Sequence, residues 1–171
     1  MSDRRFGEYG IGLRFTSGHI VLTIAMGLLL TGCPNTPTGQ EITFKAALVG
    51  SHETPLVTSI VNPTGHGTAS GHGTFTLNAA QTQLTFDISI TGLSGPVTAA
   101  HFHSGLVGET GPVVFDILST VVENYGLLTA KGTWTLSEAD FTNLLAGHVY
   151  VDFHTAMHGN GEVRGQLTQN Q

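Results

Sequence analysis

The chain has 171 residues, 11% of them charged, with a net charge of −6, a single cysteine and 23 glycines. This length suits one domain that buries a sizeable core. The acidic balance and the lack of a basic cluster exclude a nucleic-acid-binding surface of the usual kind, and one cysteine excludes an intramolecular disulfide. Few charges, with abundant threonine, glycine and apolar residues of high β-propensity, predict an all-β protein.

The first 32 residues have the pattern of an export signal. Arg4, Arg5 and Arg14 precede an apolar run over residues 20–30, interrupted only by Thr23. The run is too short for an ordinary membrane-spanning helix but has the length of a signal-peptide core. It leads into Leu30-Thr31-Gly32-Cys33, which resembles a bacterial lipobox, the motif in which the peptide is cut before the cysteine and its thiol is acylated.

The lipobox resemblance implies a bacterial lipoprotein. We expect residues 1–32 to be the signal peptide and residues 33–41 to be the lipidated cysteine with a short tether. Residues 42–168 would form the folded domain and residues 169–171 a tail. The expected location is the cell envelope, on the periplasmic or outer surface of a membrane, with Cys33 carrying a lipid such as palmitate.

Alternation of apolar and polar residues predicts strands along the rest of the chain. The clearest is residues 84–91, and further candidates are residues 42–49, 73–78, 97–103, 112–118 and 127–136. We interpret Gly65-His66-Gly67 and Gly71-His72-Gly73, a near-repeat, as a flexible loop. Ser137-Glu138-Ala139-Asp140 indicates a capped helix start. Short strands separated by turns predict an antiparallel β-sandwich or Greek-key barrel with one short helix.

The last two strands are expected to form a hairpin around residues 156–160. Placing His154 opposite Glu162 pairs Asp152 with Arg164 and sets apolar residues opposite one another on the other face. Because this register pairs polar residues on one face and apolar residues on the other, it is the register that we predict.

Polar side chains gather on one face of the expected sheet. His101 and His103 share a face because side chains alternate along a strand, and their Cα atoms lie about 6.6 Å apart at about 3.3 Å per residue. Both imidazoles can then bind one ion at about 2.0 Å, with His154 as the natural third ligand. Imidazole-rich sites suit copper or zinc. The residues that could support these ligands or complete the set are His52, Glu53, Asp152 and Glu162.

Other interpretations of this face stay open. The histidines and Glu162 could form a buried hydrogen-bonded network, with Arg164 paired to Asp152, that fixes the sheet register without a ligand. The loops could instead bind a protein or a polysaccharide. A His-x-His on a β-barrel also resembles copper–zinc superoxide dismutase, although the chain shows no full set of copper and zinc ligands.

Several spaced motifs resemble the CHRD domain, the module named after chordin. These motifs are Gly50-x-x-Glu53-x-Pro55, Ala100-His101-Phe102-His103, Gly111-Pro112-Val113-Val114, Gly132-x-Trp134 and the stretch from Ala146 to Leu167. The resemblance covers roughly residues 42–168 and implies a β-sandwich but little specific chemistry; in animals the domain belongs to a growth-factor antagonist. This chain has Phe102 where the family usually has isoleucine, and Asp152 where asparagine is usual.

We therefore expect an exported, lipid-anchored CHRD-domain protein that acts as a non-enzymatic binding module with a candidate metal site. The alternative is a copper- or zinc-binding protein with superoxide dismutase-like redox activity. No catalytic residue is assigned. The expected partners are the membrane, through the lipid on Cys33, and a protein or polysaccharide ligand. The candidate metal ligands are His101, His103 and His154, and the candidate supporting residues are Glu53, Asp152, Glu162 and Arg164.

Overall fold

The computed structural model describes residues 39–50 and 69–171. In this part of the chain the strands are β1 (Ile42–Val49), β2 (Ser70–Leu77), β3 (Gln83–Thr91), β4 (Val97–Ser104), β5 (Val113–Asp116), β6 (Val121–Asn124), β7 (Leu127–Thr135), β8 (Val149–Thr155), β9 (Val163–Gln166) and β10 (Thr168–Gln169). One helix, α1 (Glu138–Leu145), and a 3₁₀ turn at Leu118–Thr120 complete them. The expected signal peptide, Cys33, His52 and Glu53 lie outside the described residues.

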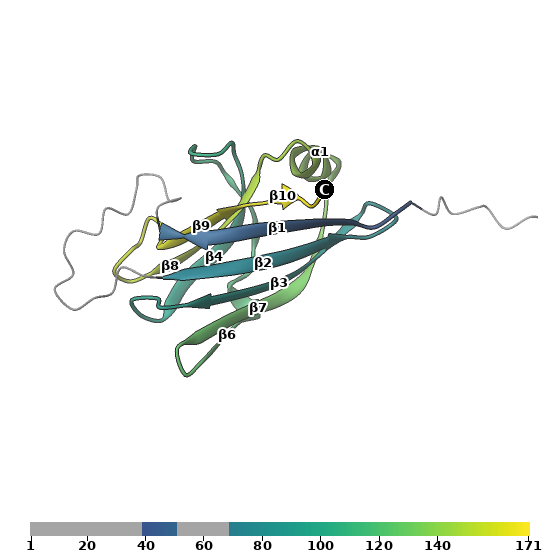
Figure 1. Ribbon diagram of the computed structural model, residues 1–171. Coiled ribbons are helices and arrows are strands. Elements are labelled where there is room, and N and C mark those ends of the chain that lie inside the picture. Colours follow the sequence, from purple (N-terminus) through teal and green to yellow (C-terminus); the bar gives the residue numbers. More distant parts are fainter. Residues whose placement is uncertain (1–38, 51–68) are drawn as a thin grey trace, which may run out of the picture. The chain divides into compact units, whose positions relative to one another are not determined.

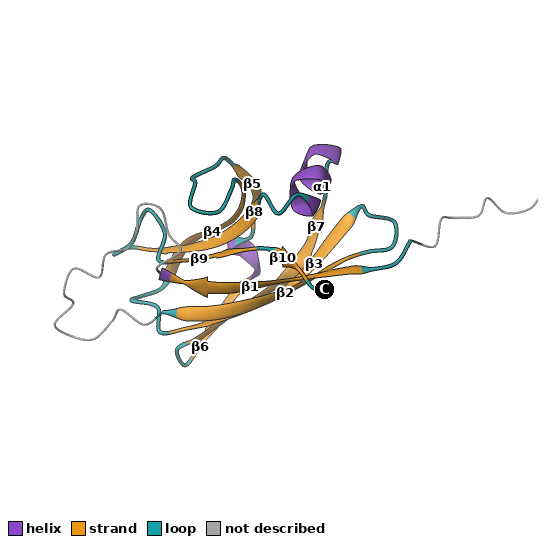
Figure 2. Cartoon of the chain, turned by 45° about the horizontal axis from the view of Figure 1, so that its top comes forward, coloured by secondary structure: helices purple, strands orange, loops and turns teal. Residues whose placement is uncertain are grey.

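The strands form one antiparallel sheet in the order β5-β4-β8-β9-β1-β2-β3-β7-β6, with β10 beside β1 (Figure 1). The sheet curls, as the turned view shows (Figure 2). The ring of Phe102 on β4 lies 5.4 Å from that of Phe86 on β3 and 5.2 Å from that of Trp134 on β7, although these strands are far apart in the sheet order. Two halves of the sheet therefore face each other, and the predicted all-β sandwich or barrel with one short helix is confirmed.

The core consists of the apolar residues that alternate along these strands. On β3 the alternating positions Leu84, Phe86, Ile88 and Ile90 are each no more than 1% exposed. Each such side chain contributes about 1.5–3 kcal/mol through its removal from water. Trp134, at 2% exposed, belongs to the same core.

The second Gly-His-Gly segment is part of strand β2, so its interpretation as a flexible loop was wrong. Gly71 and Gly73 are needed where the strand packs closely. A Cβ atom on Gly73 would lie 2.5 Å from Cζ of Phe75, and one on Gly71 would lie 2.4 Å from the carbonyl oxygen of Ser89. Glycine in a strand often marks such a close approach. Gly65-His66-Gly67, the first copy, lies outside the described residues.

The helix begins as predicted. The Ser137 hydroxyl accepts a hydrogen bond from the Asp140 backbone N–H, and the Asp140 side chain accepts one from the Ser137 backbone N–H, which forms a capping box. Gly147 follows the helix with a φ of 74°, a value that glycine adopts without strain.

The predicted hairpin register is also confirmed, since Asp152 of β8 pairs with Arg164 of β9 and Phe153 pairs with Val163. Within the described residues, no helix has the length and apolar character needed to cross a membrane.

Candidate metal centre

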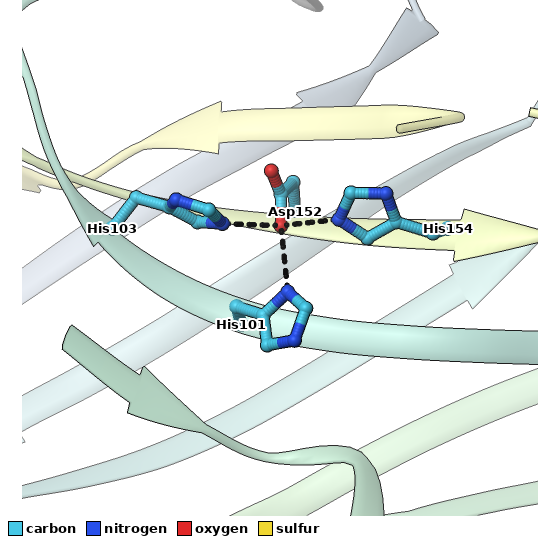
Figure 3. Close-up of side chains that lie close together, drawn as sticks. All are labelled: His101, His103, Asp152 and His154. Atoms are coloured by element: carbon cyan, nitrogen blue, oxygen red, sulfur yellow. Dashed lines mark hydrogen bonds and ion pairs between the residues drawn. The ribbon is translucent and has the colours of Figure 1, made fainter. Parts of the chain in front are cut away.

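Two neighbouring strands bring four potential metal ligands together. In the antiparallel pairing of β4 with β8, His101 lies directly opposite Asp152. His103 lies two residues further along β4 and reaches Asp152 diagonally across the strand pair, whereas His154 lies two residues further along β8 itself, on the same face as Asp152 and on its other side. Figure 3 shows the result: His103 and His154 approach the carboxylate from two sides and His101 from a third.

All four ligand atoms lie within 4.8 Å of one another, so this cluster can hold a metal ion. Oδ1 of Asp152 is 3.1 Å from Nε2 of His154, 3.2 Å from Nε2 of His103 and 3.9 Å from Nδ1 of His101. Ligands bound at about 2.0 Å to a tetrahedral ion are about 3.3 Å apart. Two contacts of Asp152 already have nearly this spacing, and the others, up to 4.8 Å, would shorten as the side chains close around an ion.

Two backbone carbonyls and one carboxylate compete for the ring hydrogens of His103 and His154. Nδ1 of His103 lies 2.9 Å from the carbonyl oxygen of Gly111, and Nδ1 of His154 lies 3.1 Å from that of Gly159. Nε2 of each ring faces Oδ1 of Asp152, and carbonyl and carboxylate oxygens only accept, so a neutral ring can donate to one of its two neighbours but not to both. A ring that donates through Nδ1 turns its Nε2 lone pair toward the carboxylate. A cation bound between Nε2 and the carboxylate would remove this conflict.

Two of the converging nitrogens are buried without a hydrogen-bond partner. They are Nδ1 of His101 and Nε2 of His103. The His103 nitrogen is close to the Asp152 carboxylate, but their orientation does not make a hydrogen bond. Buried polar atoms are normally satisfied, and an unmatched pair at one point indicates a missing ion, water or proton.

The pKa shifts follow from burial and from the neighbouring charges. Burial lowers the pKa of His101 below its ordinary value, although the negative charge of Asp152 acts in the opposite direction. Burial by itself raises the pKa of Asp152. Its contacts with His103 and His154 more than offset this, so the pKa of the carboxyl lies below its ordinary value. A neutral His101 beside an ionised Asp152 is the protonation state that metal binding requires.

Arg164 does not pair with Asp152, contrary to the prediction made for a structural network. The guanidinium donates instead to the carbonyl oxygens of Glu109 at 2.8 Å and Leu106 at 3.0 Å. It also lies 3.3 Å from the centroid of the Tyr150 ring. The strand register places Arg164 opposite Asp152, but the long side chain reaches past it to the loop between β4 and β5. The reason is that the loop offers two carbonyl oxygens and Tyr150, on β8, offers an aromatic face on the way to them.

Residues 105–112, here called the 105–112 loop, therefore cover the polar face. Gln166 donates to the carbonyl oxygen of Gly105 at 3.0 Å, and the Tyr150 hydroxyl accepts from the Gly111 N–H at 3.1 Å. The Tyr150 ring stacks on His103 with the centroids 4.8 Å apart. As a result Asp152 and Arg164 are only 4% and 2% exposed. The alternation of residues in the sequence predicted the polar face of the sheet, but it gave no indication that the 105–112 loop covers this face.

Glu162 lies in a separate structural network and is not among the four clustered ligands. Its carboxylate accepts from the Ser94 backbone N–H at 2.7 Å, the Ser94 hydroxyl at 2.7 Å and the Thr155 hydroxyl at 2.6 Å. These bonds join the turn before β4 to the end of β8. Of the two roles considered for Glu162 from the sequence, support of a metal site or part of a hydrogen-bonded structural network, these contacts correspond to the second.

Comparison with known protein families gave one match, and comparisons with curated proteins and with solved structures gave none. The profile of the CHRD domain matches residues 44–167, which is most of the chain and includes all four clustered ligands. Such a domain indicates a binding module. The chain belongs to the CHRD domain family.

Proposed function

We propose that this protein is an exported, lipid-anchored binding module whose CHRD domain holds a divalent metal ion, zinc or copper, between β4 and β8. Its proposed ligands are His101, His103, Asp152 and His154. The protein or polysaccharide that the module binds is not identified by these residues.

One observation carries the metal assignment. Four ligand atoms, one from each of three imidazoles and one carboxylate, lie within 4.8 Å of one another, and His103 and His154 each face a backbone carbonyl through Nδ1 and the same carboxylate oxygen through Nε2. Metal-binding histidines almost always donate their other ring N–H to a carbonyl or carboxylate, which fixes the ring and its tautomer. A neutral imidazole cannot donate to the carbonyl and the carboxylate at once, whereas a bound ion satisfies the carboxylate and leaves the N–H for the carbonyl.

The ligand types select among metals. Three imidazoles and one carboxylate suit zinc or copper(II), whereas calcium and magnesium prefer all-oxygen ligand sets. The four clustered ligands include no thiolate or thioether, the ligands that favour copper(I).

Metal content and calorimetric titration test this proposal. The full chain, purified from membranes in detergent, is expected to bind one zinc or copper ion. The double variant His101→Ala/His103→Ala should lose the ion while keeping its strand content by circular dichroism. The matched control is His72→Ala, because His72 is an exposed histidine on β2 outside the cluster. Binding that is absent at micromolar metal in the wild type, or unchanged in the double variant, would contradict the assignment.

The lipid anchor rests on the sequence alone, through Leu30-Thr31-Gly32-Cys33. Metabolic labelling with palmitate should modify the wild type and not Cys33→Ser. The variant should also leave the membrane fraction. Retention of label by Cys33→Ser would refute lipidation at this residue.

Superoxide dismutase-like redox activity is the second hypothesis. The His101 side chain keeps 20% of its surface exposed, so a small solute could approach an ion bound beside it. The copper-loaded chain is the sample to assay, with the double histidine variant as the blank. Superoxide consumption no faster than in that blank would exclude this activity.

A further inference from the structure

We infer that the metal ion locks two surface segments by fixing the tautomers of His103 and His154. The segments are the 105–112 loop, which His103 contacts at Gly111, and residues 156–160, here called the 156–160 turn, which His154 contacts at Gly159. This inference rests on the proposed metal site and adds a consequence of its occupancy.

Each of these two imidazoles stands between two acceptors. Nδ1 of His103 faces a carbonyl oxygen at 2.9 Å, and its Nε2 faces the Asp152 carboxylate at 3.2 Å. His154 has the same arrangement, with 3.1 Å on each side. A neutral imidazole carries one N–H and can satisfy only one acceptor. In the metal-free protein the carboxylate and the carbonyl therefore compete for the same hydrogen.

A bound ion ends this competition. Coordination occupies Nε2 with the metal, so the hydrogen must reside on Nδ1 and the ring donates to the backbone carbonyl. The carboxylate at the same time becomes a ligand and no longer needs a donor. Both segments then keep their histidine hydrogen bonds in every molecule that holds an ion.

The contacts of the 105–112 loop connect the tautomer of His103 to the order of the loop. Three of its other hydrogen bonds, two from Arg164 and one to Tyr150, involve a stack in which Arg164 covers Tyr150 and Tyr150 covers His103. Gln166 and His148 contact Gly105, at the start of the loop, independently of this stack. The loop tip is exposed, with Leu106 at 45% and Val107 at 77%. The order of an exposed apolar tip thus depends on an ion bound beneath it.

Hydrogen exchange of the full chain in detergent, with zinc or with chelator, tests the inference. The amides to follow are those of Ser104, Glu109 and Gly111 in or beside the loop, which donate to Pro112, Leu106 and Tyr150. In the turn they are those of His158 and Gly161. We expect zinc to slow exchange in both segments about tenfold, the factor that corresponds to about 1.4 kcal/mol and to the net value of one hydrogen bond.

The variant His103→Asn tests the hydrogen bond to the loop independently of metal binding. Asparagine reaches only to the position of Nδ1, so its amide can donate permanently to Gly111 while no ligand remains at the Nε2 position. The loop of this variant should exchange slowly with or without zinc. His103→Gln, which reaches the Nε2 position and leaves Gly111 without this donor, should exchange rapidly in both conditions. His72→Asn is the control, in which the zinc response should equal that of the wild type.

Long-range ¹⁵N–¹H spectra of the wild-type imidazoles give an independent readout. They should show Nδ1–H alone with zinc and a mixture of tautomers with chelator. Stoichiometric zinc binding without any change in exchange or tautomer would overturn the inference and leave the proposed metal site standing. Failure of both zinc and copper(II) to bind would overturn the inference and the proposed metal site together.

Discussion

Replacing Asp152 with asparagine exchanges one carboxylate oxygen for an amide NH₂ and leaves the side-chain volume almost unchanged. Oδ1 of Asp152 lies 3.2 Å from Nε2 of His103 and 3.1 Å from Nε2 of His154. An amide nitrogen at this point can donate to both lone pairs, which a carboxylate cannot do. We therefore expect the metal-free variant to be more stable than the metal-free wild type.

The size of the gain follows from the two contacts. A neutral hydrogen bond contributes about 1 kcal/mol net, so the pair should add about 1–2 kcal/mol to the free energy of unfolding. Removing the charge acts in the opposite direction, because the pKa of Asp152 lies below its ordinary value and the fold therefore stabilises the ionised carboxyl, so the gain should lie toward the lower end of this range. For a domain of this size, a gain of 1–2 kcal/mol raises the melting temperature by about 3–8 °C.

Thermal unfolding at pH 8 with chelator measures this shift, because pH 8 is well above the ordinary histidine pKa of about 6.5. The control is Asp87→Asn, which changes the net charge equally but only breaks an exposed ion pair with Lys131. Its effect should stay below about 1 kcal/mol. With zinc added, the wild type should become the more stable protein, because the variant lacks the anionic ligand.

A lower melting temperature for metal-free Asp152→Asn would refute the reasoning. It would show that the carboxylate accepts N–H hydrogens from the histidines when no ion is bound. The cluster would then be the structural network considered from the sequence.

Three further changes test other parts of the structure. Gly73→Ala should destabilise the fold by about 1–3 kcal/mol in urea unfolding, because its Cβ would lie 2.5 Å from the buried Phe75 ring; a change below 0.5 kcal/mol would contradict that close contact. Glu162→Ala removes three hydrogen bonds to one carboxylate and leaves the Ser94 N–H without its acceptor, so a loss of about 3–5 kcal/mol is expected by the same assay. Burial lowers the pKa of His101 below its ordinary value of 6.5, so the unfolded chain takes up this proton first as the pH falls. The contribution of His101 to metal-free stability is therefore present above about pH 6.5 and is lost as the pH falls through the folded pKa, and His101→Gln should flatten the pH dependence of unfolding in chelator.

The alternation of residues along single strands predicted much of this site. It placed His101 and His103 on one face, opposite the buried Phe102, because the side-chain period of a strand is fixed. The hairpin register was predictable for a related reason, since a shift of one residue would have exposed Phe153.

Contacts that are made by backbone carbonyls or that involve loops could not be predicted from the sequence. The carbonyl oxygens of Gly111 and Gly159 fix the two imidazoles, yet any residue at these positions would carry the same carbonyl. The contacts of Arg164 were not predictable either. The strand register places its Cα opposite Asp152, but its long side chain extends to the 105–112 loop and donates to the Glu109 carbonyl oxygen. Gly71 was left out of the predicted strand because β-propensity disfavours glycine, whereas the close approach of the Ser89 carbonyl oxygen requires it.

Aspartate and asparagine at position 152 differ in one side-chain atom, an oxygen or an NH₂ group, and this difference bears on whether the cluster is a hydrogen-bonded network or a metal site. The resemblance to CHRD domains leads one to expect asparagine there, and its amide could donate to both imidazoles while each ring donates through Nδ1 to its backbone carbonyl. The cluster would then be satisfied without an ion. With aspartate, the carbonyls and the carboxylate are all acceptors, and the proposed divalent cation would satisfy the carboxylate and leave each ring N–H for its carbonyl. The strands therefore set the geometry of the site, and the carboxylate at position 152 is the reason that we propose a metal ion there.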